Sequence, residues 1–379
     1  MIKANILIIL TIIFIASGFW IKSASKGNDF CSKDVYENYK KNFMSQDGRI
    51  IDTQRNNITT SEGQSYIMLR SVLSDDKSTF DLTYNWAKNN LQRPDFLFAW
   101  HWGKSNNGEY KILDENSASD ADIDIAFALI LAYEKWGEKK YLEAARPIIN
   151  SIFENETKQI GDYLVLMPGI LQVSSQKTEI NPSYFATYPF KVFQKYDEKH
   201  DWNKLVDSSY HFLKLSIKTT KTGLPPDWCL IENDKILLEM DKSDFSYDAI
   251  RIFPRLFLDY KMTGEKRALP ILSKVYFFIE RWTFSGKSPR PNSWDNTKTF
   301  YVNYKANGQL KNNDEPVGSI AVLLPIINFY KPKTATEIYK KKILPTLEDE
   351  AYWTNNQGYY SKNLLWFGCY LYEDFKGTK

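Results

Sequence analysis

The chain has 379 residues, 43% of them hydrophobic and 25% charged, which suits a globular protein with a sizeable core in one or two domains. Its 49 basic and 46 acidic residues leave a net charge of +3, and this balance predicts no nucleic-acid partner, because nucleic-acid binding needs clustered basic residues. Cys31, Cys229 and Cys369 lack metal-ligand spacing and only 3 His are present, so we expect no metal site and no cofactor. One disulfide and three free thiols are both compatible with this cysteine count.

The N-terminus has the pattern of a targeting segment. A Lys at position 3 is followed by 18 uncharged, mostly apolar residues, 4–21, and then by small residues at 23–25. One Lys before such a run is typical of a signal peptide, and a run of this length is at the lower limit for a transmembrane anchor. We therefore predict a signal peptide or signal anchor over residues 1–30. The rest of the chain would lie outside the cytoplasm, either secreted or tethered to the membrane by this segment alone.

From about residue 33 onward the apolar pattern is mainly helical. Strand-like alternation is local, as at 163–167, and no low-complexity linker divides the chain, so we predict one domain over 31–379. About a dozen helices in one domain suit an all-α (α/α)6 barrel, in which an inner ring of helices is wrapped by an outer ring. The clearest helical stretches are 61–73, 80–89, 123–136, 141–153, 201–216, 247–260, 268–282, 319–329 and 335–343.

Three acidic segments lie on this pattern. Glu62 begins the first strong helical stretch, where a carboxylate complements the helix dipole. In the segment 118–126, ASDADIDIA, we expect Asp120 just before a helix, where it is free to face a cleft, and Asp122 as the cap of that helix. Asp248 and Arg251 are three positions apart, close enough to pair on one helix face. Taken singly, each position also suits an ordinary cap or a surface ion pair.

Together these segments resemble one family. The stretch 118–136, ASDADIDIAFALILAYEKW, resembles the signature of the family 8 glycoside hydrolases, which include endoglucanases, xylanases and chitosanases. SEGQSY at 61, FAWHWGK at 98, NPSYFA at 181 and SYDAIR at 246 follow in the family's order, so the resemblance covers nearly the whole chain after the N-terminal segment. The likeness is greatest to endoglucanases encoded with bacterial cellulose or exopolysaccharide synthases, which share the FAWxWG and DENSASDAD style of sequence.

The resemblance implies an inverting glycosidase with two carboxyl groups in different protonation states. Glu62 would be the general acid that protonates the leaving oxygen, and Asp248 the general base that activates water. Asp120 would hold the sugar at the cleavage point through its hydroxyls, with Asp122 as a further substrate contact. An inverting enzyme needs one protonated and one ionised carboxyl group, with room for a water between them.

The resemblance also implies a set of residues that bind the substrate. Arg251 would orient Asp248 and keep it ionised, and Tyr184 would lie beside the catalytic water. Trp100 and Trp102 would form platforms for sugar rings, and Tyr360 would be a further contact. Aromatic residues make up 15% of the chain, which favours carbohydrate binding, because the flat apolar faces of sugars stack on aromatic rings.

The reaction implied is endo-acting hydrolysis of a cellulose-type β-1,4-glucan, carried out during synthesis and export of a polysaccharide and in contact with a synthase complex. Xylan and chitosan are alternative substrates; cationic chitosan would favour a more acidic cleft than this chain's charge suggests. A non-catalytic polysaccharide-binding component of an export complex is the alternative from another class, although it would not need all three carboxylates. A terpene cyclase is disfavoured, because no DDxxD motif is present.

Overall fold

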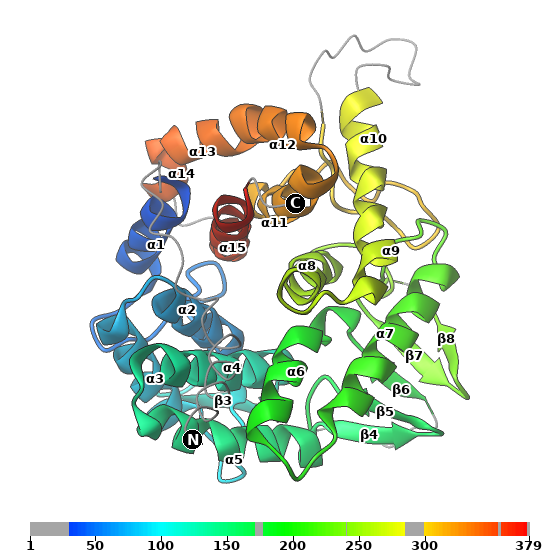
Figure 1. Cartoon of the computed structure of the whole chain (residues 1–379). Coiled ribbons are helices and arrows are strands. Elements are labelled where there is room, and N and C mark those ends of the chain that lie inside the picture. Colours follow the sequence, from blue (N-terminus) through cyan, green and yellow to red (C-terminus); the bar gives the residue numbers. More distant parts are fainter. Residues whose placement is uncertain (1–29, 171–176, 240, 285–298, 355–357, 377–379) are drawn as a thin grey trace, which may run out of the picture. The chain divides into compact units, whose positions relative to one another are not determined.

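The computed structural model describes residues 30–170, 177–239, 241–284, 299–354 and 358–376 (Figure 1). From Cys31 onward the chain forms one compact unit, whose described residues are mostly helical, so the predicted all-α class is confirmed. The predicted targeting segment lies outside the described residues except for Phe30. Within the described part of the chain, no helix has the length and apolar character needed to cross a membrane.

An inner ring of helices runs through this unit, and each helix packs on the next one around the ring. Arg70 of the first inner helix donates a hydrogen bond to the backbone carbonyl of Asn363 in the last one at 3.3 Å, and this contact closes the ring. The inner helices are, in order, α2 (Ser61–Leu73), α4 (Ser119–Trp136), α6 (Thr187–Tyr196), α8 (Ile252–Thr263), α11 (Val317–Tyr330) and α15 (Tyr359–Phe375).

An outer layer of helices covers the ring, and the chain alternates between the two layers, which confirms the (α/α)6 barrel (Figure 1). The inner helix α4 is continuously buried over 119–132 because it packs against α2, α5 and α6 at once, and its sequence is accordingly apolar on all sides. The outer helices are α1 (Phe30–Phe43), α3 (Lys77–Asn90), α5 (Lys139–Asn155), α7 (Trp202–Thr219), α9 (Leu269–Leu272), α10 (Tyr276–Phe284), α12 (Pro332–Ile338), α13 (Leu344–Glu348) and α14 (Glu350–Thr354).

The helix α15 was not among the predicted helices. It packs against α11 so closely that a Cβ atom at Gly368 would lie 2.2 Å from the backbone carbonyl carbon of Ala321. Glycine is therefore required at the contact, although it is a poor helix former and weakens the helical pattern in the sequence. The packing that closes the ring thus depends on Gly368, and the same residue weakens the helical pattern of α15 in the sequence.

Several predicted helix boundaries differ from the structure. The stretch 61–73 is α2 as predicted, whereas 247–260 begins with the 3-10 turn η2 (Ala249–Arg251) before α8. The stretch 268–282 begins at the end of the 3-10 turn η3 (Lys266–Ala268) and is divided by a second one, η4 (Ser273–Val275), and 335–343 ends in the π-helical turn η5 (Tyr339–Ile343). Apolar spacing alone does not distinguish these tighter and wider turns from an α-helix.

Small antiparallel sheets lie in the loops between helices. The sheet β1-β2-β3 pairs Thr59 with Trp102 and Thr60 with His101, so it places the Trp-bearing strand beside the residues that lead into α2. The predicted strand at 163–167 is β5. The strands are β1 (Thr59–Thr60), β2 (Ala99–Lys104), β3 (Tyr110–Ser117), β4 (Thr157–Ile160), β5 (Tyr163–Leu166), β6 (Thr178–Ile180), β7 (Cys229–Glu232) and β8 (Lys235–Leu237).

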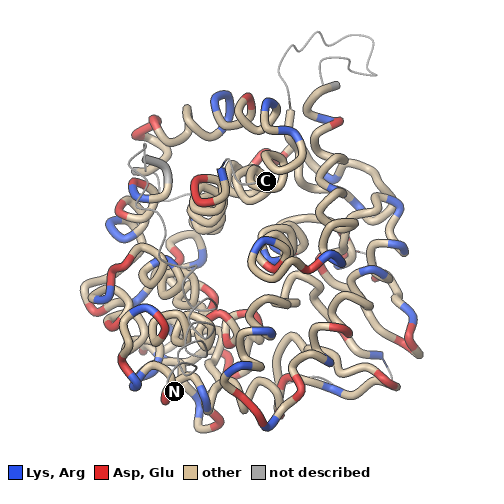
Figure 2. Tube along the Cα trace, in the orientation of Figure 1, with Lys and Arg blue, Asp and Glu red and all other residues tan. Residues whose placement is uncertain are grey.

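Charged residues of both signs are interspersed over the outer helices (Figure 2). Many of them pair locally, as Lys77 does with Asp81 at 2.6 Å and Lys341 with Glu337 at 2.9 Å. Exposed pairs of this kind contribute little to stability and mainly keep the surface soluble. The charges that matter for chemistry lie inside the ring.

Candidate active site

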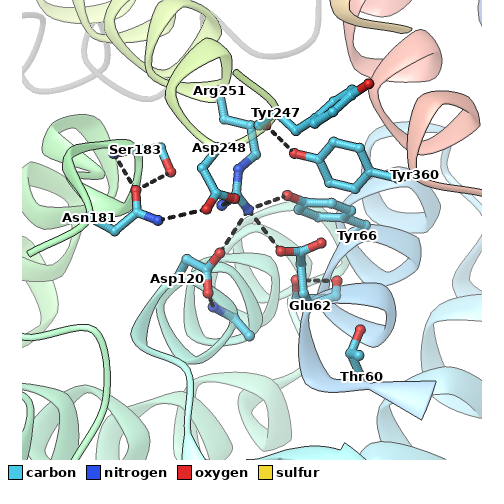
Figure 3. A network of polar contacts seen from close by, with 12 residues as sticks. Thr60, Glu62, Tyr66, Asp120, Asn181, Ser183, Tyr247, Asp248, Arg251 and Tyr360 are labelled. Carbon is cyan, nitrogen blue, oxygen red and sulfur yellow. Dashed lines mark hydrogen bonds and ion pairs between the residues drawn. The ribbon is translucent and has the colours of Figure 1, made fainter. Parts of the chain in front are cut away.

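Arg251 lies at the centre of a cluster of acidic residues (Figure 3). Its Nη1 donates to Glu62 Oε2 at 2.8 Å, to Asp120 Oδ2 at 2.9 Å and to the hydroxyl of Tyr66 at 3.2 Å. Its Nη2 donates to Asp248 Oδ1 at 2.8 Å, which confirms the predicted pairing of these two residues. One guanidinium group therefore brings together the three carboxylates predicted to act in catalysis.

These residues meet because the inner helices begin at the same end of the ring. Glu62 and Asp120 lie in the first turns of α2 and α4, and Asp248 directly precedes the η2 turn that leads into α8. Tyr184 ends the short turn η1 (Pro182–Tyr184) before α6, and Tyr360 lies in the first turn of α15. The positive ends of α2 and α4 favour carboxylates at these positions.

Three carboxyl groups share one arginine, so their charges are not balanced. Burial raises the pKa of Glu62 to about 7, with the negative charges of Asp120 and Asp248 adding to the effect and Arg251 opposing it. Burial also raises the pKa of Asp120, whose side chain is only 2% exposed. The side chains of Glu62 and Asp248 are 26% and 33% exposed, so both remain accessible to a substrate. Glu62 can therefore hold a proton near neutral pH while its side chain remains partly exposed.

Asp248 accepts hydrogen bonds on both of its carboxylate oxygens. Oδ1 accepts from Arg251, while Oδ2 accepts from the amide of Asn181 at 3.2 Å and from the indole Nε1 of Trp228 at 2.9 Å. The side-chain carbonyl of Asn181 accepts from the backbone N–H and the hydroxyl of Ser183, which fixes its amide nitrogen toward Asp248 (Figure 3). Asp248 is thus held as an acceptor, as a general base must be.

Two of the predicted aromatic residues lie next to this cluster. The ring of Tyr184 is 5.5 Å from the guanidinium carbon of Arg251 and packs edge-on against Trp228 at 5.9 Å. The hydroxyl of Tyr360 donates to the backbone carbonyl of Tyr247 at 2.6 Å, directly beside Asp248 (Figure 3). Tyr360 therefore helps to hold the loop that carries Asp248.

Trp100 and Trp102 lie on β2, which is hydrogen-bonded to the strand leading into Glu62. Both are partly exposed, and the ring of Trp100 is 4.7 Å from that of His101. Trp102 stacks on Tyr110 at 5.1 Å and packs edge-on against Trp86, with the guanidinium of Arg49 4.4 Å from its centre. The side chain of Trp102 is therefore held by Tyr110, Trp86 and Arg49. Trp100 lies two residues earlier on the same strand and packs beside His101.

Asp122 does not lie where the sequence pattern placed it. The helix α4 begins at Ser119 with Ala118 as its cap, so Asp120 and Asp122 both fall within the first turn. Residues two apart on a helix point about 200° from each other, and Asp122 consequently faces away from Arg251. Its Oδ1 accepts from the backbone N–H of Phe98 at 2.8 Å, and the residue is fully buried. This position gives Asp122 a structural contact where a sugar contact was predicted.

Asp122 instead forms a buried carboxyl pair with Glu156. Glu156 is also fully buried and accepts from the hydroxyl of Ser117, at the end of β3, at 2.6 Å. Burial raises the pKa of Glu156 to about 8, and burial together with Glu156 raises the pKa of Asp122 well above its usual value. The pair therefore holds at least one proton at neutral pH, because two unscreened negative charges would repel each other.

Sequence analysis missed several residues of the site. Tyr66 was recognisable in principle, because it follows Glu62 by four residues and shares its helix face. Asn181 lies in the NPSYFA segment, of which only Tyr184 was selected. Trp228 is 20 residues from Asp248 with no shared periodicity, so nothing in the sequence indicated their contact.

The inner helices bring together a Glu that can hold a proton and a hydrogen-bonded Asp, and partly exposed aromatic residues lie nearby. These are the features of a glycoside hydrolase. The model of the glycosyl hydrolases family 8 matches residues 12–302, and the chain belongs to this family. It is therefore an enzyme that hydrolyses glycosidic bonds.

Similar proteins match most of the chain. The endoglucanase of Salmonella typhi is 30% identical over 346 residues, which cover 89% of this chain and 86% of that protein. The endoglucanase of Escherichia coli K12 is 29% identical with the same coverage. The crystal structure of an endo-1,4-D-glucanase from Vibrio fischeri ES114 is 27% identical, covers 90% of this chain and 95% of its own, and superposes with a TM-score of 0.76.

The buried pair predicts a pH-dependent stability. Because the pKa of Glu156 is raised from 4.5 to about 8, the native state binds more protons than the unfolded state between these values, and the free energy of unfolding falls as pH rises through this window. In Glu156→Gln the fall in melting temperature between pH 5 and pH 8.5 should be smaller than in the wild type. Glu143→Gln, an exposed change on the same helix, is the control; equal falls in all three proteins would contradict the prediction.

Proposed function

We propose that this enzyme is an endo-acting β-1,4-glucanase that works with inversion. The observation that carries the proposal is the position of Arg251 between Glu62 and Asp248, which combines a protonated acid and an acceptor carboxylate in one accessible cluster. The endoglucanase names of the relatives in Salmonella typhi and Escherichia coli, and the 1,4-glucanase activity named for the Vibrio fischeri structure, support the choice of substrate.

In the proposed mechanism, Glu62 donates its proton to the leaving glycosidic oxygen. Asp248 takes a proton from a water molecule that attacks the opposite face of the sugar, and the C–O bond breaks as the new one forms. Inversion requires about 6.5–9.5 Å between the two carboxyl groups to accommodate that water. Asp120 and Tyr184 would bind the sugar at the cleavage point, and Trp100 would stack on a neighbouring sugar ring.

We first predict that the chain lacking residues 1–30 releases reducing ends from soluble carboxymethyl-cellulose. Glu62→Gln and Asp248→Asn should each lower kcat/KM by at least about 100-fold, because general acid–base catalysis typically contributes about 10²–10⁴-fold. Glu143→Gln and Asp207→Asn make the same chemical changes at exposed sites and should leave the rate unchanged.

Other outcomes of this assay have definite meanings. Full activity in both site variants would overturn the roles assigned to Glu62 and Asp248. Activity on xylan or chitosan without activity on glucan would change the substrate and keep the mechanism. Binding of the polymer without hydrolysis of any of the three would favour the non-catalytic component of an export complex.

Inversion predicts the anomer that is formed first. Hydrolysis of a β-linkage with one displacement at the anomeric carbon releases an α-anomer, whereas two displacements release a β-anomer. Proton NMR of a short cello-oligosaccharide digest, recorded before mutarotation equilibrates the products, should show the α-anomer appearing first. Early accumulation of the β-anomer would rule out the proposed single displacement.

We also propose that the enzyme acts outside the cytoplasm, delivered or anchored by residues 1–30, beside a polysaccharide synthase. Cys369 is disulfide-bonded, and structural disulfides form and persist mainly in oxidising compartments, which supports this location. In cells expressing the full chain, the enzyme should either be released into the medium or be digested when protease is added to spheroplasts. Deletion of residues 1–30 should leave it inside the cell and protected from the protease. Protection of the full chain would contradict the proposal.

A further inference from the structure

The loop that carries Asp248 is fastened at both sides to one buried carboxyl group. Oδ1 of Asp227 accepts from the backbone N–H of Ser246 at 3.1 Å and from that of Ala249 at 2.7 Å. The Ser246 hydroxyl donates to the other oxygen of the same carboxyl group. Asp227 therefore bridges the residues that flank Tyr247 and Asp248 in the sequence.

The neighbouring residue, Trp228, contacts the Asp248 side chain itself. Its indole Nε1 donates to Oδ2 of Asp248 at 2.9 Å. The backbone on either side is also fixed, because the N–H of Asp227 donates to the carbonyl of Asp244 at 2.6 Å and the Ser243 hydroxyl donates to the carbonyl of Trp228 at 2.7 Å. Residues 227–228 and 243–249 thus form one hydrogen-bonded unit around the carboxylate.

We propose that Asp227 and Trp228 are positioning residues for Asp248: Asp227 fixes the backbone on both sides of it, and Trp228 fixes the direction of its carboxylate. This inference rests on the proposed role of Asp248 as the general base. A general base whose carboxylate points in the wrong direction cannot accept the proton of the attacking water, and small displacements of catalytic groups lower the reaction rate strongly.

The burial and the charges around Asp227 determine in which protonation state it holds the Asp248 loop. Asp227 is 9% exposed, and burial, followed by the negative charge of Asp248, raises its pKa to about 6. Lys311, paired with Asp244 at 2.6 Å, is the nearby cation. Below about pH 6 Asp227 is therefore neutral, and an asparagine can reproduce its contacts, accepting from the two backbone N–H groups and donating to Ser246.

Asp248 is also surrounded by charged and titratable groups from other elements. They are Arg251 on η2, Glu62 on α2, Asp120 on α4, Asp227 before β7, Tyr184 on η1 and Tyr360 on α15. None of these groups is changed by replacing Trp228 with phenylalanine. That substitution keeps a ring beside Tyr184 and removes the indole N–H through which Trp228 donates to Asp248, while the donors on Arg251 and Asn181 remain.

The test compares three variants of the full chain by the pH dependence of kcat/KM on carboxymethyl-cellulose. Trp228→Phe should move the acid limb to higher pH, because the ionised form of Asp248 loses a donor, and should lower kcat about tenfold with little change in KM. Asp227→Ala should lower kcat/KM at least about tenfold at pH 5, whereas Asp227→Asn should stay near the wild-type value there. Rescue by asparagine at pH 5 shows that the hydrogen bonds of the neutral side chain are sufficient for the role of Asp227.

Matched controls remove the same groups far from the site. Trp136→Phe loses an indole hydrogen bond to Asp75, and Asp207→Asn neutralises an exposed carboxylate; neither should change the pH profile. Melting temperatures establish that each variant is folded. An unshifted acid limb in folded Trp228→Phe, or equal losses in Asp227→Asn and Asp227→Ala, would overturn the inference.

A second readout does not depend on turnover. With aspartate labelled by ¹³C at the side-chain carboxyl carbon, the Asp248 resonance is assigned by its absence in Asp248→Asn. Its chemical shift should change in Trp228→Phe, because the carboxylate loses a hydrogen-bond donor, and stay unchanged in Trp136→Phe. A wild-type chain without hydrolytic activity would overturn the proposed function, while this resonance would still confirm or refute the contact between Trp228 and Asp248.

Discussion

The arrangement of the active site depends on the guanidinium group of Arg251. It is 4% exposed and contacts Glu62, Asp120 and Asp248, so its own burial is compensated by the acids around it. The acids, however, outnumber the cation, and a buried excess of negative charge is relieved by retaining a proton. The cluster thus combines Glu62, which can retain a proton, with Asp248, which accepts hydrogen bonds on both of its oxygens, and this is the combination that the proposed mechanism requires.

The barrel brings these groups together from distant parts of the chain. Glu62 and Arg251 are 189 positions apart and meet because α2 and α8 begin at the same end of the inner ring. The ring in turn is completed by the close packing of α15 on α11 and by the contact of Arg70 with Asn363.

The sequence predicted those parts of the site that depend on local spacing. Glu62 at the start of a helix and Asp248 three residues before Arg251 are local patterns, and the structure contains both. The role predicted for Asp122 assumed that this residue caps the helix. The helix instead begins at Ser119, with Ala118 as its cap, so the side chain of Asp122 lies on the face opposite Asp120. The contacts of Trp228 and Asn181 with Asp248 arise only from tertiary packing, so no spacing in the sequence encodes them. Local spacing therefore predicted where Glu62 and Asp248 lie, the resemblance to the family supplied the roles proposed for them, and the groups that contact Asp248 required the fold.

The two faces of α4 connect the carboxylate cluster with the strand that carries Trp100. One face presents Asp120 to Arg251, and the opposite face holds Phe98 through Asp122, immediately before the strand that carries Trp100. The same strand pairs with Thr59 and Thr60, which lead directly to Glu62. Trp100 is thus tied to α4 by one hydrogen bond and to α2 by a sheet, so its position follows the helices that carry the carboxylates. In the proposed mechanism these contacts would hold Trp100, as a stacking platform, in register with the carboxylates, because rigid elements position a site more accurately than free loops do.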